Sequence, residues 1–127
     1  IESLILEKGM DDAIKRAKKY VEAGADAIMI HSRKKEPEEI FTFSKKFRTE
    51  FENIPLVCVP TSYNLVKEEE LQKSGFNIVI YANHLMRSSY PAMKSVAYNI
   101  LKYGRSAEVD DDLISIKEVL ELIPGTK

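Results

Sequence analysis

The sequence has no tryptophan, one cysteine, two histidines and only five glycines among its 127 residues. The single cysteine, Cys58, excludes a disulfide within the chain and is typical of a cytoplasmic protein. Its apolar setting, PLVCVPT, predicts a core thiol rather than a reactive one, because no cationic neighbour is present to lower its pKa. The sequence contains no glycine-rich phosphate loop, nucleophile elbow or metal-ligand spacing. Short motifs therefore identify no site, and candidates must come from where polar residues fall in the fold.

The chain also lacks an excess of either charge and any long apolar run. Its 19 basic and 20 acidic residues nearly cancel, which argues against a nucleic acid or an acidic membrane as a partner. No apolar stretch approaches the roughly 20 residues that span a bilayer. We expect no secretory signal, although the chain begins at Ile1 rather than methionine, so that its natural N-terminus is expected further upstream. The 44% hydrophobic and 31% charged content predicts a single soluble domain over residues 1–127.

What the sequence does contain is an alternation of strand and helix patterns. Short apolar runs predict strands buried on both faces, and apolar positions at helical spacing follow each of them. Pro91 predicts that the long helix around it bends or begins late. Repeated β-α units of about 25 residues are typical of a parallel sheet with right-handed connections. The predicted strands are residues 26–32, 54–62 and 77–84, with 2–6 as the tail of one more; the predicted helices are 9–25, 36–51, 67–75, 85–104 and 115–125.

Polar side chains follow each predicted strand at the point where it ends. In parallel α/β folds these carboxyl ends meet at one edge, where ligands bind. A histidine at such a position is either a structural hydrogen-bonding group or a functional one, and the pattern alone leaves both open. The serines and the asparagine are equally suited to cap the helices that follow. The residues concerned are His31 and Ser32, Thr61 and Ser62, and Asn83 and His84.

Three stretches in fixed order, IHSRKK, VPTSYN and YANHLMRSS, resemble the phosphoenolpyruvate mutase family of the isocitrate lyase superfamily. The resemblance covers essentially the whole chain and implies an α/β fold, the C-terminal half of a (β/α)8 TIM-type barrel with strands 5–8. The His-Ser pair at residues 31–32, where the carbon–carbon lyases carry a carboxylate, implies the branch that handles phosphonopyruvate. That branch holds the mutase and phosphonopyruvate hydrolase, and YANH at residues 81–84 slightly favours the mutase.

The resemblance implies a parent enzyme that interconverts phosphoenolpyruvate and phosphonopyruvate, forming the C–P bond of phosphonate biosynthesis. It implies Mg²⁺ as cofactor, with the ligands expected in the missing N-terminal half, so that these 127 residues alone are expected to be inactive. A phosphonopyruvate hydrolase and a non-catalytic α/β interaction module are the alternatives. An upstream cluster of metal-binding aspartates would favour an enzyme over a module.

The resemblance also implies roles for individual residues. It makes His31 the catalytic group, donating a hydrogen bond or positive charge to substrate or phosphoryl oxygens, with protonation tuning that role near neutral pH. Helix capping remains the alternative for Thr61 and Asn83, and structural ion pairing for Arg87 and Glu2. The expected substrate-binding residues are Ser32, Thr61, Asn83, Arg87 and Glu2, and no metal ligand is expected.

The expected partners are a small-molecule substrate and further copies of the chain. The resemblance implies a homo-oligomer in which the helix over residues 85–102 packs on a neighbouring subunit. Neither a nucleic acid nor a membrane is expected as a partner. The expected location is cytoplasmic.

Overall fold

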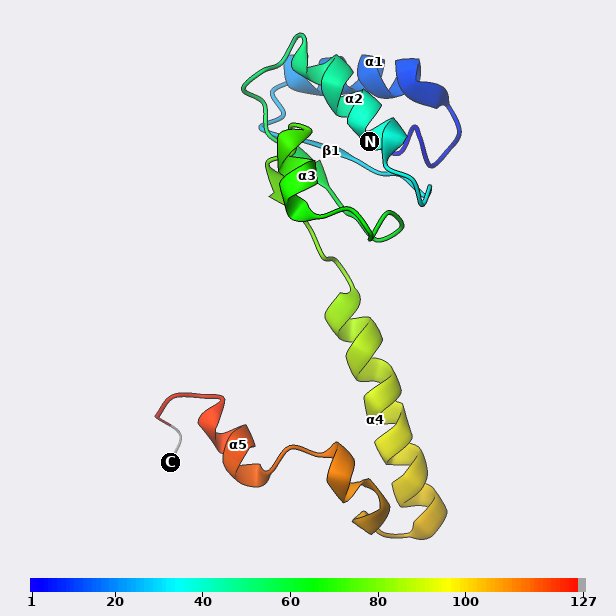
Figure 1. Ribbon diagram of the computed structural model, residues 1–127, viewed down its shortest axis with the longest axis vertical. Coiled ribbons are helices and arrows are strands. Elements are labelled where there is room, and N and C mark those ends of the chain that lie inside the picture. Colours follow the sequence, from blue (N-terminus) through cyan, green and yellow to red (C-terminus); the bar gives the residue numbers. More distant parts are fainter. Residues whose placement is uncertain (126–127) are drawn as a thin grey trace. The chain divides into compact units, whose positions relative to one another are not determined.

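A computed structural model describes residues 1–125 of the protein. The chain divides into two compact units, Ile1–Ala82 and a second that begins at Asn83. The sequence predicted a single domain over residues 1–127 that comprises strands 5–8 of a barrel. That assignment stays a prediction. The first unit contains α1 (Gly9–Glu22), β1 (Ile28–Ile30), α2 (Glu38–Arg48), β2 (Leu56–Cys58), α3 (Glu68–Lys73) and β3 (Ile78–Val79). The second contains α4 (His84–Tyr103), the 3-10 helix η1 (Ala107–Asp112) and α5 (Ile116–Glu121) (Figure 1).

The three strands form one parallel sheet in the order β1-β2-β3. Ile30 pairs with Cys58, and Cys58 in turn pairs with Val79. Since each strand is followed by a helix before the next strand begins, the predicted β-α alternation is confirmed. The strands are shorter than predicted, because only two or three residues of each run pair with a neighbour. The polar residues after each run therefore lie beyond the paired segment, in loops except for His84, which begins α4.

The two faces of the sheet differ in burial. Ile28 and Ile30 are 2% and 0% exposed, and Leu56 on the same face is fully buried. Met29 and Ile78, which the register places on the opposite face, are 38% and 47% exposed. The prediction of strands buried on both faces is confirmed for β2, where Val57 on the second face is 8% exposed, and is wrong for β1 and β3. Within the first unit, helices cover one face of the sheet and leave much of the other open.

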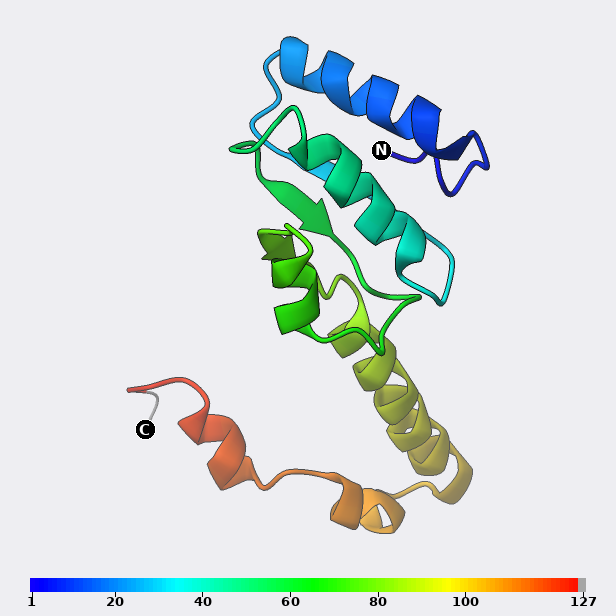
Figure 2. The same cartoon turned by 45° about the horizontal axis from the view of Figure 1, so that its top comes forward.

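Helices α1 and α2 lie side by side over the covered face (Figure 2). Helix α1 packs through Ala13 and Ala17, one turn apart and both fully buried. Helix α2 buries Ile40, Phe43 and Phe47, which is the apolar face that the helical spacing predicted. The rings of Phe43 and Phe47 stack with centroids 5.9 Å apart, so the helix pair encloses an aromatic core.

The start of the chain differs from the prediction. Residues 3–7 form turns, so residues 2–6 are not the tail of a strand. Only Ile1 behaves as a strand residue. Its amino group donates to the Met29 carbonyl at 2.6 Å, and the Ile1 carbonyl accepts the His31 amide at 3.3 Å. This alternation is the pattern of a parallel ladder at the free edge of β1. It places Glu2 beside the end of that strand.

Helix α4 begins at His84 and runs through Pro91 to Tyr103, so the prediction of a late start is wrong. Pro91 removes one backbone donor from the helix, and the remaining turns on both sides continue regularly. Gly104 ends the helix in the left-handed region at φ 65°, a conformation that glycine adopts without a steric penalty. None of the described helices is both long enough and apolar enough to cross a membrane.

Candidate functional site

His31 and Glu2 lie together at the carboxyl end of β1. The imidazole Nε2 of His31 is 3.9 Å from Oε1 of Glu2, within ion-pair range when the ring is protonated. The His31 side chain is 28% exposed and the Glu2 side chain 56%, so the pair reaches solvent. An imidazole held here can donate a hydrogen bond or a positive charge to a ligand that approaches the strand ends.

Ser32 is directed into the protein. It is 7% exposed, its hydroxyl donates to a carboxylate oxygen of Glu39, and it accepts the backbone N–H of Lys34 at 3.0 Å. The capping alternative does not describe this contact, since the N-cap of α2 is Pro37. Ser32 is instead the centre of a tight turn that links the end of β1 to the first turn of α2.

Thr61 lies in the loop after β2. Its amide donates to the Val59 carbonyl at 2.8 Å, which forms a tight turn, and its side chain is half-buried. Beneath this loop Cys58 and Tyr63 are both fully buried. Burial raises the pKa of the Cys58 thiol to about 11 and also raises the pKa of Tyr63, so both groups are neutral at physiological pH. The prediction of a core thiol agrees with this burial.

Asn83 and Arg87 belong to the second unit. Asn83 occupies the N-cap position of α4, but within residues 1–125 its side chain makes no capping hydrogen bond. Its carbonyl accepts the Arg87 amide at 2.9 Å, which is the first bond of the helix. Arg87 is exposed one turn into α4. The substrate-contacting roles of both residues stay predictions.

At the amino ends of the strands, Arg48 forms hydrogen bonds with the loops that lead into β2 and β3. Its guanidinium donates to Asn77 Oδ1 at 2.6 Å, and Asn77 Oδ1 also accepts the amide of Leu56 at 2.9 Å. The other acceptors are the carbonyl oxygens of Phe51, Glu52, Ile54 and Gly75. Contacts at the amino ends of parallel strands serve stability, which leaves the carboxyl edge with His31 as the candidate site.

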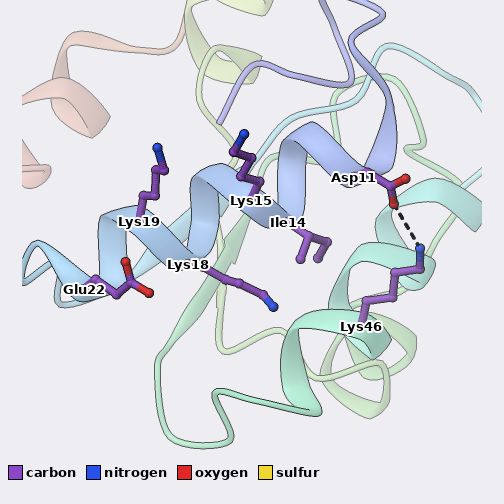
Figure 3. A pocket seen from close by; sticks show the side chains of 7 residues that line it. All are labelled: Asp11, Ile14, Lys15, Lys18, Lys19, Glu22 and Lys46. Carbon is purple, nitrogen blue, oxygen red and sulfur yellow. Dashed lines mark ion pairs between the residues drawn. The ribbon is translucent and has the colours of Figure 1, made fainter.

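A pocket of about 410 Å³ also opens along the outer surface of α1 and α2 (Figure 3). Lysines dominate its lining, but Lys46 is paired with Asp11 at 3.6 Å and Lys18 with Glu50. None of the sequence-predicted site residues lines it. The lining residues are Asp11, Ile14, Lys15, Lys18, Lys19, Glu22 and Lys46.

A metal site requires several acidic, histidine or cysteine side chains that converge. Among residues 1–125, no group of three or more such side chains is placed to hold a metal ion. Glu2 and His31 form only a pair. The residues present do not fit a Mg²⁺ site by themselves.

Glu39 is the residue that the sequence reasoning missed. It lies in the first turn of α2 with its side chain 14% exposed, and it contacts Ser32 and also Lys34, whose Nζ is 2.8 Å away. The sequence places Glu36, Glu38 and Glu39 within four residues of one another, so it signals an acidic helix start without distinguishing its members. Only the packing of α2 against the β1 loop selects Glu39.

The fold and the site together define a parallel β/α protein of the barrel type, with its polar groups at the carboxyl edge of the sheet. A family model described as phosphoenolpyruvate phosphomutase matches residues 1–101. The chain therefore belongs to the phosphoenolpyruvate phosphomutase family, and the resemblance seen in the sequence is confirmed.

Individual relatives agree with this assignment. Phosphonopyruvate hydrolase from Variovorax sp. (strain Pal2) is 43% identical over 123 residues, 96% of this chain and 41% of that protein. Phosphoenolpyruvate phosphomutase from Tetrahymena pyriformis is 38% identical over 122 residues, 96% of this chain and 40% of that protein. A crystal structure of phosphonopyruvate hydrolase with oxalate and Mg²⁺ matches with a TM-score of 0.81 at 43% identity, covering 95% of this chain and 42% of that one.

The chain spans about 40% of the length of the curated relatives that it matches. The fold prediction is confirmed: the chain is an α/β segment of a (β/α)8 barrel, with parallel strands and connecting helices. Since more than half of the relatives' length lies outside this segment, the activity of the whole protein is a matter for proposal.

Proposed function

We propose that the parent protein is a phosphoenolpyruvate phosphomutase, which moves a phosphoryl group between the enol oxygen of phosphoenolpyruvate and carbon 3 of phosphonopyruvate. The observation that carries the proposal is the family match over residues 1–101, together with the IHSRKK stretch that places His31 at the carboxyl edge of the sheet. The reaction conserves all atoms, since one P–O bond breaks as one P–C bond forms.

His31 is the group that we assign to this chemistry. The transferred phosphoryl group carries heavy negative charge through a loose transition state, so catalysis depends on positioning and on electrostatic stabilisation. A partly exposed imidazole at the strand end can donate a hydrogen bond to those oxygens. The adjacent Glu2 carboxylate, 3.9 Å from Nε2, helps to orient the ring.

The remaining assignments are weaker parts of the same proposal. Thr61 lies in the loop after β2, where a hydroxyl can reach the carboxylate end of a substrate bound at the strand ends. Asn83 and Arg87 open α4 and supply an amide and a cation suited to an anionic substrate. Ser32 is committed to Glu39, so we propose that it supports the site through its loop.

Mg²⁺ is part of the proposal for the parent protein only. A structure of phosphonopyruvate hydrolase is in complex with oxalate and Mg²⁺. Because residues 1–125 do not supply a converging set of metal ligands, we propose that the ligands lie in the part of the parent outside this chain. Such an ion would supply Lewis acidity toward the substrate oxygens, and we derive no step of this chain's chemistry through it.

Phosphonopyruvate hydrolase is the second candidate function. The observation in its favour is the 43% identity to the Variovorax enzyme, against 38% to the Tetrahymena mutase. Both activities use the same carboxyl-edge histidine in our proposal, and they differ in whether the phosphoryl group returns to the substrate or passes to water.

Phosphorus NMR separates these functions. The full-length protein is incubated with phosphonopyruvate and Mg²⁺, and the 127-residue chain serves as the control. We expect the phosphonate signal to be replaced by a phosphate-ester signal. Inorganic phosphate would establish the hydrolase instead, and an unchanged phosphonate signal with folded full-length protein would favour a non-catalytic module. We expect no conversion by the 127 residues alone.

We also propose that the parent is a cytoplasmic homo-oligomer in which residues 85–102 lie at the subunit interface. Within the described chain no residue of α4 is buried, although the helix carries many large apolar side chains. Sedimentation velocity of the full-length protein tests this, with Leu85→Glu and Leu101→Glu expected to shift the protein toward monomer. The exposed side chains are Leu85, Met86, Tyr90, Met93, Tyr98, Ile100, Leu101 and Tyr103.

A further inference from the structure

The loop that follows His31 is held by a carboxylate that lies outside the predicted site. Ser32 has a single hydroxyl hydrogen and donates it to Glu39, while its oxygen accepts the Lys34 amide at 3.0 Å. At 7% exposure the hydroxyl is shielded from solvent as well as saturated as a donor. Ser32 is therefore unsuited to donate to a substrate, and its effect on the site must pass through the backbone that it organises.

Glu39 uses both of its carboxylate oxygens on this loop. Oε1 accepts from Ser32, and Oε2 pairs with Lys34 Nζ at 2.8 Å, which raises the pKa of Lys34. The Glu39 side chain is 14% exposed. Glu38, its neighbour in the same first turn of α2, is exposed and makes no side-chain hydrogen bond or ion pair among the contacts of residues 1–125. Helix-dipole stabilisation is common to both glutamates, so it does not explain why only Glu39 turns inward.

His31 is consequently fixed from two directions. On its amino-terminal side, β1 pairs with β2, and the His31 amide donates to Ile1. On its carboxyl-terminal side, the adjacent Ser32 is anchored to Glu39. Without the Ser32–Glu39 hydrogen bond, the backbone after His31 would be held only by the bond from the Lys34 amide to the Ser32 hydroxyl. The direction of the imidazole depends on the backbone at residues 31–32, to which the partly exposed side chain is attached.

We propose that Glu39 is a positioning residue for His31, acting through the Ser32 hydroxyl. The inference rests on the proposed function of His31 and adds to it a group that lies on α2, away from the strand end. A displacement of about 1 Å in a group that stabilises a transition state can cost on the order of 100-fold in rate. The loss falls on kcat rather than KM, because the misplaced group contributes most in the transition state.

The test uses full-length protein with phosphonopyruvate and Mg²⁺ and compares kcat and KM among variants of matched fold, verified by circular dichroism. Glu39→Ala is expected to lower kcat about 10- to 100-fold, with KM within about 3-fold of wild type. Glu39→Gln keeps an amide oxygen that accepts from Ser32, and its kcat is expected within about 3-fold of wild type. Glu38→Ala, the matched control in the same turn, is expected to leave both constants unchanged.

The pathway through Ser32 is tested by a double-mutant cycle. Ser32→Ala is expected to lower kcat at least as much as Glu39→Ala does, because it also removes the acceptor of the Lys34 amide, and the double variant is expected to lose no more than Ser32→Ala. Losses that multiply would show that the two residues act separately and would overturn the inference, as would wild-type kcat in Glu39→Ala. If Glu39→Ala does not fold, the inference is tested with Ser32→Ala and Glu39→Gln. Loss of activity in Glu39→Gln would also overturn the inference.

Failure of the proposed function has a different appearance. Absence of turnover in folded wild-type protein, or wild-type turnover in His31→Ala, would overturn the role of His31 itself. In that case amide exchange at Lys34 still reports on the anchor. If the Lys34 amide then exchanges faster in Glu39→Ala but at an unchanged rate in Glu38→Ala, Glu39 stabilises the loop but has no catalytic group to position. That result would overturn the inference.

Discussion

The carboxylate of Glu2 lies 3.9 Å from the imidazole Nε2 of His31 at the carboxyl end of β1. The contact exists because Ile1 pairs with the edge of that strand before the chain turns away. Both side chains reach solvent, so the pair contributes at most about 1 kcal/mol to stability. Its consequence is therefore for the direction of the imidazole more than for folding.

Replacing His31 with alanine in the full-length protein is expected to lower turnover of phosphonopyruvate by about 100-fold or more, because a positioned donor to the phosphoryl oxygens is lost. The substitution removes a partly exposed ring, so thermal stability is expected to change little. Phosphorus NMR gives the rate, and circular dichroism controls for folding. Wild-type turnover in this variant would contradict the assignment.

Arg48→Ala is expected to lower the free energy of unfolding by about 3 kcal/mol. The substitution leaves several backbone carbonyls and Asn77 Oδ1 without their donor. Arg48→Lys is expected to recover only part of this, since an ammonium group cannot reproduce the planar fork of the guanidinium.

Urea denaturation followed by far-UV circular dichroism measures these differences. Lys45→Ala is the matched control, because Lys45 is an exposed cation on the same helix, and its effect is expected within about 0.5 kcal/mol. A loss in Arg48→Ala no larger than that of the control would show that solvent replaces the lost bonds.

Gly75→Ala is expected to destabilise the protein by about 2 kcal/mol. Gly75 has φ +93°, and an added Cβ would lie 2.8 Å from Ser44 Oγ. Ser44 cannot easily move, because it is fully buried and its hydroxyl donates to the Ser74 carbonyl. The cost thus combines backbone strain with a clash.

Gly24→Ala isolates the strain from the clash. Gly24 has a similar φ of +96°, but nothing lies within 4 Å of its added Cβ. We expect it to cost about 1 kcal/mol, and the difference between the two variants in urea denaturation gives the cost of the contact at Ser44. Equal losses in both variants would mean that the core adapts around Gly75.

The free energy of unfolding is expected to fall as the pH rises from about 9 to about 11. Burial raises the Cys58 pKa from its ordinary value of 9.0 to about 11, so in this range the unfolded thiol loses its proton while the folded one keeps it. The unfolded state then binds fewer protons, which gives stability a negative slope with pH. The contribution is complete below pH 9 and is lost as the pH passes through 11.

Cys58→Ala is the comparison for this titration. Urea denaturation at a series of pH values is expected to show a shallower decline in the variant than in wild type. Burial raises the pKa of Tyr63 as well, and Cys58 adds to that shift, so the difference between the two proteins reports on Cys58 together with its coupling to Tyr63. Identical slopes would show that Cys58 does not titrate differently in the folded and unfolded states.

Much of the fold could be predicted from local pattern. The positions of Ile40, Phe43 and Phe47 at helical spacing predicted the buried face of α2, and the apolar runs predicted the order of strands and helices. The start of the chain was mistaken because residues 2–6 have the apolar character of a strand, and only partner geometry decides whether such residues pair or turn. Of the two alternatives for Pro91, the late start was wrong, because the remaining bonds of a twenty-residue helix sustain it from His84.

The sequence by itself determined that a parallel strand delivers His31 to the carboxyl ends of the sheet, because an apolar run followed by a polar residue carries that information locally. The tertiary structure alone decided which groups surround His31. Glu2 reaches it through the pairing of Ile1 with β1, and Glu39 was selected over Glu38 by the packing of α2. Contacts between residues distant in the chain depend on the relative placement of whole elements, which no local pattern of residues encodes.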